Sequence, residues 1–60
     1  MRPIEIERII LKDGWYFIKQ TGGHRHYKHP TKPGKVTISF HPGDIDKGTL
    51  KKIYEQAGLK

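Results

Sequence analysis

Histidines and a pair of glycines are the residues of this 60-residue chain whose types and spacing could do chemistry. His24 directly follows Gly22 and Gly23, and His26 and His29 come soon after it. Glycines leave the backbone uncrowded and permit positive φ, so a phosphate could approach backbone N–H groups beside the His24 imidazole. An imidazole can give or accept a proton near neutral pH, and RNA brings its own nucleophile, the 2′-hydroxyl. A histidine placed in this way could cleave RNA without an obligatory metal ion, but these residues by themselves indicate only a nucleic-acid-binding site.

The positive charge of the chain is concentrated around these histidines. Between Asp13 and Asp44 there is no carboxylate, while five cations fall in that interval, so most of the formal net charge of +6 comes from one segment. A field of one sign attracts polyanions, and phosphate-bearing partners are the first expectation. The five cations are Lys19, Arg25, Lys28, Lys32 and Lys35.

Composition excludes several classes of protein. The absence of cysteine excludes a disulfide framework, a thiolate nucleophile and a zinc site built on sulfur. No apolar run approaches the roughly 20 residues that span a bilayer, and the start of the chain lacks the apolar core of a secretory signal. We expect one domain over residues 1–60, without a membrane partner, in the cytoplasm.

The hydrophobic pattern predicts a helix, three strands and a second helix. The first helix covers residues 3–13 with Gly14 as its cap, and the last begins at Asp46 and ends at Gly58. The strands cover residues 15–20, 24–29 and 35–41. This order predicts an α+β fold, α-β-β-β-α, in which a three-stranded antiparallel sheet carries two helices on one face. The layout is similar to that of double-stranded-RNA-binding domains.

Alternation along the strands predicts a dry face and a wet face of the sheet. If Tyr27 is in the core, then His24, His26 and Lys28 point to the other, exposed face, while Arg25 points with Tyr27. In the third strand Val36, Ile38 and Phe40 share the packed face. Aromatic residues at the start of a strand usually close the core of such a domain, so we expect this of Trp15 and Tyr16.

Non-catalytic interpretations of these histidines remain open beside the catalytic one. A histidine in a basic hairpin more often contacts phosphate, or only solvent, than catalyses a reaction. His26, His29 and His41 are expected to be supporting or structural, since none follows the glycine turn. A metal site built from His24, His26 and His41 is disfavoured, because the chain has no sulfur ligand and no carboxylate is close in sequence, so no metal or other cofactor is expected.

The lysines of the last helix raise a further alternative. These lysines are more typical of the solvent-exposed face of an amphipathic helix than of a phosphate-binding site. They nevertheless leave a DNA-binding function open. A module that holds RNA without cutting it is the other alternative. These lysines are Lys47, Lys51 and Lys52.

An ordered set of short motifs resembles the HicA family of bacterial toxins, and it runs from the first helix to the end of the chain. The set is Gly14-Trp15-Tyr16, Gly22-Gly23-His24, Tyr27-Lys28-His29-Pro30, Val36-Thr37-Ile38, His41-Pro42, Asp44-Ile45, Lys47-Gly48-Thr49-Leu50 and Gln56-Ala57-Gly58-Leu59. The resemblance implies an endoribonuclease (an mRNA interferase) that cleaves messenger RNA and halts translation. It also implies a HicB antitoxin that binds the toxin in a hetero-oligomer and blocks its site.

Residue by residue, the resemblance puts the family's catalytic histidine at His24 and its glycine at Gly22. Two departures stand out: Gly23 replaces a frequent serine, and Asp46 replaces a frequent proline. The lost hydroxyl removes a possible hydrogen bond to substrate or imidazole. With His24 as the catalytic residue, the expected RNA contacts are Gly22, Gly23, Lys19, Arg25, His26, Lys28 and Lys35.

Overall fold

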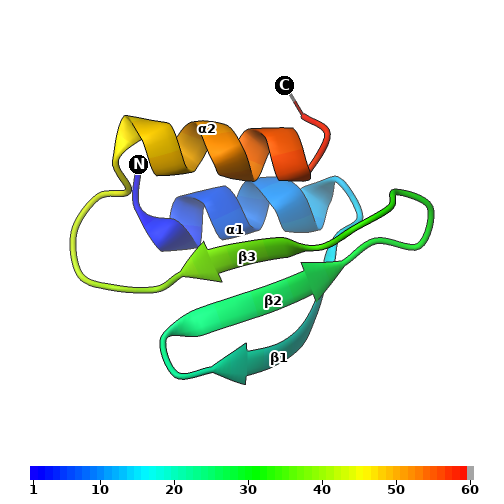
Figure 1. The fold of residues 1–60 in the computed structure, drawn as a ribbon, viewed down its shortest axis with the longest axis horizontal. Helices are drawn as coiled ribbons and strands as arrows, with labels where there is room; N and C mark the ends of the chain where they lie inside the picture. Colours follow the sequence, from blue (N-terminus) through cyan, green and yellow to red (C-terminus); the bar gives the residue numbers. More distant parts are fainter. Residues whose placement is uncertain (60) are drawn as a thin grey trace.

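A computed structural model describes residues 1–59 and has the predicted order of elements (Figure 1). The α+β class, the α-β-β-β-α order and the antiparallel three-stranded sheet are all confirmed. The elements are α1 (Pro3–Lys12), β1 (Tyr16–Thr21), β2 (His24–Lys28), β3 (Val36–Ser39) and α2 (Lys47–Gln56).

The first helix begins and ends on local signals. Pro3 occupies the first helical turn, where the missing N–H costs nothing, and the Glu5 carboxylate accepts a 2.7 Å hydrogen bond from the backbone N–H of Arg2. Gly14 follows the last turn with a φ of +110°, a conformation that favours glycine. The helix therefore ends one residue earlier than the predicted 3–13, and Gly14 ends it as expected.

The second helix also has the predicted ends. The Asp46 carboxylate accepts hydrogen bonds from the backbone N–H and the hydroxyl of Thr49, at 3.1 and 2.8 Å. Gly58, with a φ of +67°, follows Ala57, the C-cap residue of the helix. Both signals are local in sequence, which is why they could be read without a structure.

The sheet has the order β1-β2-β3, with both pairs antiparallel. Phe17 lies opposite Tyr27 and Lys19 opposite His26, so the register shifts at a β-bulge between Phe17 and Lys19. The third strand ends at Ser39, two residues short of the predicted residue 41. The predicted strands 15–20 and 24–29 differ from β1 and β2 by one residue at their ends.

Both helices pack on one face of the sheet, against β3 and the centre of β2 (Figure 1). Trp15 belongs to this core as predicted, and its Nε1–H donates to the Ala57 carbonyl at 3.3 Å. The same prediction was wrong for Tyr16, which is 51% exposed: it lies opposite Lys28 in the register of β1 and β2, so its side chain points to the face of the sheet that the helices leave uncovered. The buried apolar residues are Ile6, Ile10, Trp15, Tyr27, Val36, Ile38, Ile45, Ile53 and Ala57.

Within residues 1–59, no helix has the length and apolar character needed to cross a membrane.

Candidate nucleic-acid interface

The face of the sheet that the helices leave uncovered carries the residues predicted to meet RNA. Strand register places His24 between Thr21 of β1 and Ser39 of β3, and places His26 between Lys19 and Thr37. Because side chains alternate along a strand, all these residues lie on the face opposite the buried Tyr27. We call this surface, together with Lys28 and Lys35, the open sheet face.

His24 is the first residue of β2 and is exposed to solvent. Gly22, in the turn between β1 and β2, has a φ of +59°, which a residue with a side chain adopts only under strain. Nothing lies within 4 Å of where a Cβ on Gly22 would be, so the backbone beside His24 is open to a ligand. A solvent-accessible imidazole next to an uncrowded turn is a suitable arrangement for proton transfer on a bound phosphodiester.

The turn that carries His24 is fixed by hydrogen bonds from both neighbouring strands. The Gln20 side-chain amide donates to the Gly22 carbonyl at 2.9 Å, and the backbone N–H of Phe40 donates to the Gly23 carbonyl at 2.7 Å. A Cβ on Gly23 would lie 3.5 Å from the Phe40 carbonyl oxygen, which is ordinary van der Waals contact. A serine at position 23 would therefore fit, whereas the positive φ of Gly22 favours glycine.

His26 lies deeper in the open sheet face than His24. Its Nδ1 is 3.2 Å from the Thr37 hydroxyl, and its side chain is partly buried. Partial burial disfavours the imidazolium and lowers the pKa of His26 below its ordinary value, and the charges of Lys35 and Lys19 lower it further. His26 is therefore poised to be neutral at pH 7, and both lysines lie close enough to act on it.

The cations of this face are available for binding. Lys19, Lys28 and Lys35 are exposed, and none forms an ion pair with any residue of the described chain, 1–59. Lys32, the fifth cation of the basic segment, is used differently: its ammonium bonds the Asp13 carboxylate at 2.5 Å and the Ala57 carbonyl at 3.0 Å. Lys32 connects the end of α1 to the end of α2, so it contributes to the fold.

Arg25 is not brought together with the other predicted RNA contacts. It lies on the helix-facing side of β2, where its guanidinium donates to the Glu7 carboxylate at 3.0 Å and to the Gln20 amide oxygen at 3.2 Å. The guanidinium also stacks 4.2 Å from the centre of the Phe40 ring. The hydrogen bond to Glu7 is the main reason that the pKa of Arg25 is raised. Through Gln20, Arg25 supports the turn before His24.

Glu7 was missed by the sequence reasoning. It is a carboxylate with 7% exposure on the buried stripe of α1, and it accepts a 2.5 Å hydrogen bond from the Tyr27 hydroxyl as well as the bond from Arg25. The one available signal was its spacing, because Pro3, Glu7 and Ile10 fall on one side of a helix and the other two are apolar. A charged residue in such a stripe predicts a buried partner.

The other two histidines lie outside the strands. His29 is held in a loop: its Nε2 is 2.8 Å from the Asp13 carbonyl, and its Nδ1 accepts from the backbone N–H groups of Thr31 and Lys32 at 3.1 Å. His41 lies beyond β3 with its Nδ1 2.9 Å from the Pro42 carbonyl. His29 is structural, as expected. Across residues 1–59, no three His, Cys, Asp or Glu side chains gather as metal ligands.

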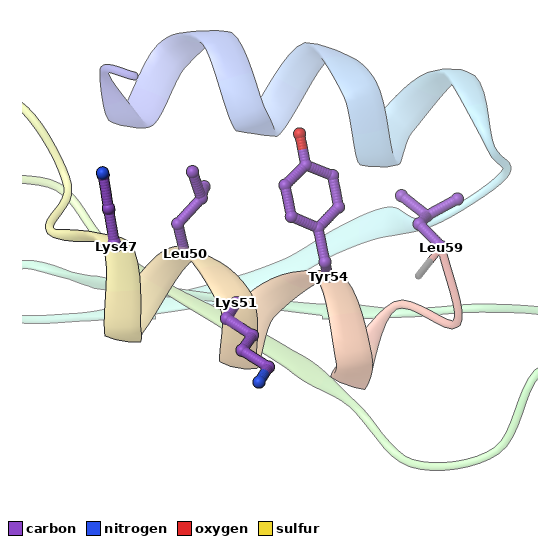
Figure 2. Close-up of a pocket in the computed structure, with 5 residues that line it drawn as sticks. All are labelled: Lys47, Leu50, Lys51, Tyr54 and Leu59. Atoms are coloured by element: carbon purple, nitrogen blue, oxygen red, sulfur yellow. The ribbon is translucent and has the colours of Figure 1, made fainter.

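The groove drawn in Figure 2 lies in the helical layer rather than on the open sheet face. It has a volume of about 570 Å³, and Leu50, Tyr54 and Leu59 give it an apolar floor, with Lys47 and Lys51 beside them. Two lysines of the last helix are thus found beside an apolar groove, across the sheet from His24.

Comparison with known proteins bears on this arrangement. A family model described as "HicA toxin of bacterial toxin-antitoxin" matches residues 5–59, which is nearly the whole chain and includes every residue of the open sheet face. The comparison with individually curated proteins gave no match.

Proposed function

Because this chain belongs to the HicA family of bacterial toxins, we propose that it is a metal-independent endoribonuclease that cleaves messenger RNA in the cytoplasm and arrests translation. The observation that supports the proposal best is the position of His24. It is an exposed imidazole beside an open glycine turn, on a sheet face with three unpaired lysines within the described residues. In this proposal His24 is the catalytic residue.

The proposed reaction is an internal transfer at phosphorus. The 2′-oxygen forms a bond to phosphorus as the bond to the 5′-oxygen of the next nucleotide breaks, which leaves a 2′,3′-cyclic phosphate and a free 5′-hydroxyl. One proton leaves the attacking oxygen and one reaches the departing oxygen, and His24 moves one of these protons. A positioned general acid or base typically contributes about 10²–10⁴ in rate.

The proposed RNA contacts divide into charges and backbone groups. Lys19, Lys28 and Lys35 attract the phosphates and offset the charge that grows on phosphorus in the transition state. His26 contributes a neutral imidazole at pH 7, which follows from the lowered pKa of this residue. The turn at Gly22 and Gly23 lets a phosphate approach the backbone closely. Arg25 is proposed to act from the opposite face, by holding Gln20.

The partner of this toxin is an antitoxin, as membership of a toxin–antitoxin family implies. We propose that it is a HicB-type protein that forms a hetero-oligomer with the chain and denies RNA access to the open sheet face. An antitoxin rich in carboxylates would complement the net charge of +6.

The test is cleavage of a defined messenger RNA in excess EDTA by the wild-type chain and by His24→Ala. The wild type should give fragments with cyclic phosphate ends, which resist phosphatase until acid opens the ring, and His24→Ala should fall by about 10²-fold or more. His41→Ala is the matched control, since it also removes an exposed imidazole, but one beyond the sheet. It should cut like the wild type.

Three outcomes would count against the proposal. Cleavage by a folded His24→Ala variant removes His24 from the reaction. A requirement for divalent metal removes the metal-independent mechanism. Binding without cleavage by every variant indicates a module that holds RNA without cutting it.

A further inference from the structure

The exposed apolar side chains of this protein gather at one edge of the fold. Among residues 1–59, the large apolar side chains that are exposed are Met1 and five residues of α1 and β1, whereas β2, β3 and α2 contribute none. Isolated exposed apolar residues are ordinary, but a contiguous group marks an interaction site. We call this group the apolar edge; its five residues are Ile4, Leu11, Tyr16, Phe17 and Ile18.

The two halves of the apolar edge meet through Glu7 and its partners. Successive helical residues are 100° apart, so Ile4 and Leu11 lie next to Glu7 on the surface of α1. Glu7 bonds Arg25 and the hydroxyl of Tyr27. On the other side of that group lies Phe17, whose ring packs edge-on against Tyr27 with centroids 6.0 Å apart.

No part of the described chain, residues 1–59, covers the surface between α1 and β1. Ile4 and Leu11 are 42% and 43% exposed, and Phe17 is 48% exposed although it points to the helix side of the sheet. Figure 1 shows the reason: β1 is the strand farthest from the helices, and α1 lies over β3 and β2. A side chain as large as phenylalanine is thereby left with half of its surface in water.

The backbone of β1 is open as well. The sheet order β1-β2-β3 makes β1 an edge strand, so one row of its N–H and C=O groups has no partner strand. An extended segment of another chain can pair with such an edge, with apolar side chains entering the neighbouring pockets. Tyr16, Phe17 and Ile18 are three consecutive large apolar residues on this edge, and Ile18 lies at the bulge after which pairing with β2 resumes at Lys19.

The charged residues beside the apolar edge indicate the chemistry of the partner that would bind there. Arg8 lies between Ile4 and Leu11 on α1, and Lys19 follows Ile18 on β1; both are exposed, and neither makes an ion pair within residues 1–59. A segment with an apolar centre and carboxylates at its ends would satisfy both the surface and the charges. Toxins of this family have a dedicated protein partner, the antitoxin.

We infer that the antitoxin docks on the apolar edge, by laying an extended apolar segment with acidic flanks along β1 and against Ile4 and Leu11. This rests on the proposed pairing with an antitoxin, but not on the role of His24. Tyr16 lies opposite Lys28, at the far end of β2 from His24, about 13 Å away at 3.3 Å per residue. The antitoxin therefore docks beside the nuclease site, and Lys19, which follows Ile18 on β1 and lies opposite His26, is at the border of the two surfaces.

The experiment measures the affinity of the purified antitoxin encoded with this toxin for the wild-type chain and for variants. Leu11→Ser with Phe17→Ser should weaken binding by about 30-fold or more, the effect expected when apolar side chains at the centre of an interface are truncated. Ile4→Ser with Ile18→Ser is a second pair that leaves the packing of Phe17 on Tyr27 in place, and it should weaken binding in the same direction. Leu59→Ser, in the groove of Figure 2, is the matched control and should bind like the wild type.

Thermal unfolding and RNA cleavage are recorded for every variant. Folded edge variants that keep the wild-type affinity overturn the inference, as does a loss of affinity in Leu59→Ser alone. A wild-type chain that dimerises by itself and becomes monomeric in the edge variants assigns the surface to a second copy. If no variant cleaves RNA, including the wild type, the nuclease proposal fails while the affinities still decide the docking site.

Discussion

At the scale of single residues, the environment of Glu7 decides what its neighbours can do. A carboxylate with 7% exposure needs partners, and it has two, the Arg25 guanidinium and the Tyr27 hydroxyl. Burial raises the pKa of Tyr27, and the hydrogen bond to Glu7 raises it further, because an ionised phenol beside a carboxylate is unfavourable. Arg25 is thereby kept on the helix side, where it holds Gln20 and, through Gln20, the turn before His24.

The raised pKa of Tyr27 predicts a loss of stability in alkali. The unfolded chain releases the Tyr27 proton near pH 10 while the folded chain still holds it, so the free energy of unfolding is unaffected below that pH and falls above it. The contribution to the slope is at most about 1.4 kcal/mol per pH unit. Urea unfolding between pH 8 and 11 measures it.

Tyr27→Phe should remove this contribution and cost about 1.5–3 kcal/mol at pH 8, since a hydrogen bond to a charged group is lost. Tyr16→Phe is the matched control, because it removes an exposed hydroxyl from the neighbouring strand. It should keep the alkaline slope of the wild type. An equal slope in Tyr27→Phe and wild type would show that Tyr27 is not the group responsible.

At the scale of elements, two histidines that are close in sequence have different environments because of the segments that hold them. His24 lies on an open strand, whereas His29 lies in the loop after β2 and closes that loop onto the end of α1. Its Nδ1 accepts two backbone N–H bonds, so the proton is on Nε2, which donates to the Asp13 carbonyl. The ring also packs edge-on against Trp15, with centroids 5.2 Å apart.

His29→Ala should therefore destabilise the fold without entering the reaction. It leaves three backbone groups without their partner, and about 1–3 kcal/mol for each such buried group suggests a total of about 2–4 kcal/mol after partial rehydration. That is a large part of the few kcal/mol expected for a domain of this size. Urea unfolding gives the cost, and RNA cleavage at low temperature, where the variant is folded, should remain.

His24→Ala is the comparison for this prediction, and the two variants should separate cleanly. His24→Ala should lose cleavage and keep its stability, because His24 is exposed. A stable His29→Ala variant that cannot cleave would show that the loop after β2 takes part in the site.

At the scale of the whole molecule, the sheet separates three surfaces. The open sheet face carries the residues proposed to act on RNA, the helical layer carries the groove of Leu50, Tyr54 and Leu59, and the apolar edge lies between them. Lysines are present on both the sheet face and the last helix. Net charge alone cannot say which of them meet RNA, but the salt dependence of binding can.

Two triple variants with the same change in charge make this measurement. Lys19, Lys28 and Lys35 replaced together by Gln should reduce the slope of log affinity against log salt by about 2, at roughly 0.7 for each phosphate of a single strand that a lysine no longer neutralises. Replacement of Lys47, Lys51 and Lys52 by Gln removes the same charge from α2 and should leave the slope nearly unchanged. Equal reductions would mean that RNA also reaches the helical layer.

The sequence by itself determined the order of the elements and the side of β2 on which His24 lies. Both follow from local rules: caps and glycines end helices where they occur, and alternation along a strand is fixed by its pleat. Once Tyr27 is assigned to the core, His24 and His26 must face away from it. The family motifs likewise depend on residues that are close in sequence.

Only the tertiary structure decided which charges are paired and which apolar residues stay exposed. Arg25 meets Glu7 across 18 positions of sequence, and no local pattern specifies that pairing. Phe17 is half-exposed although its side chain points to the helix side of the sheet, because the helices pack on β3 and the centre of β2 and leave β1 uncovered. Pairing and coverage depend on the distance between elements, and that distance is set when the helices pack on the sheet.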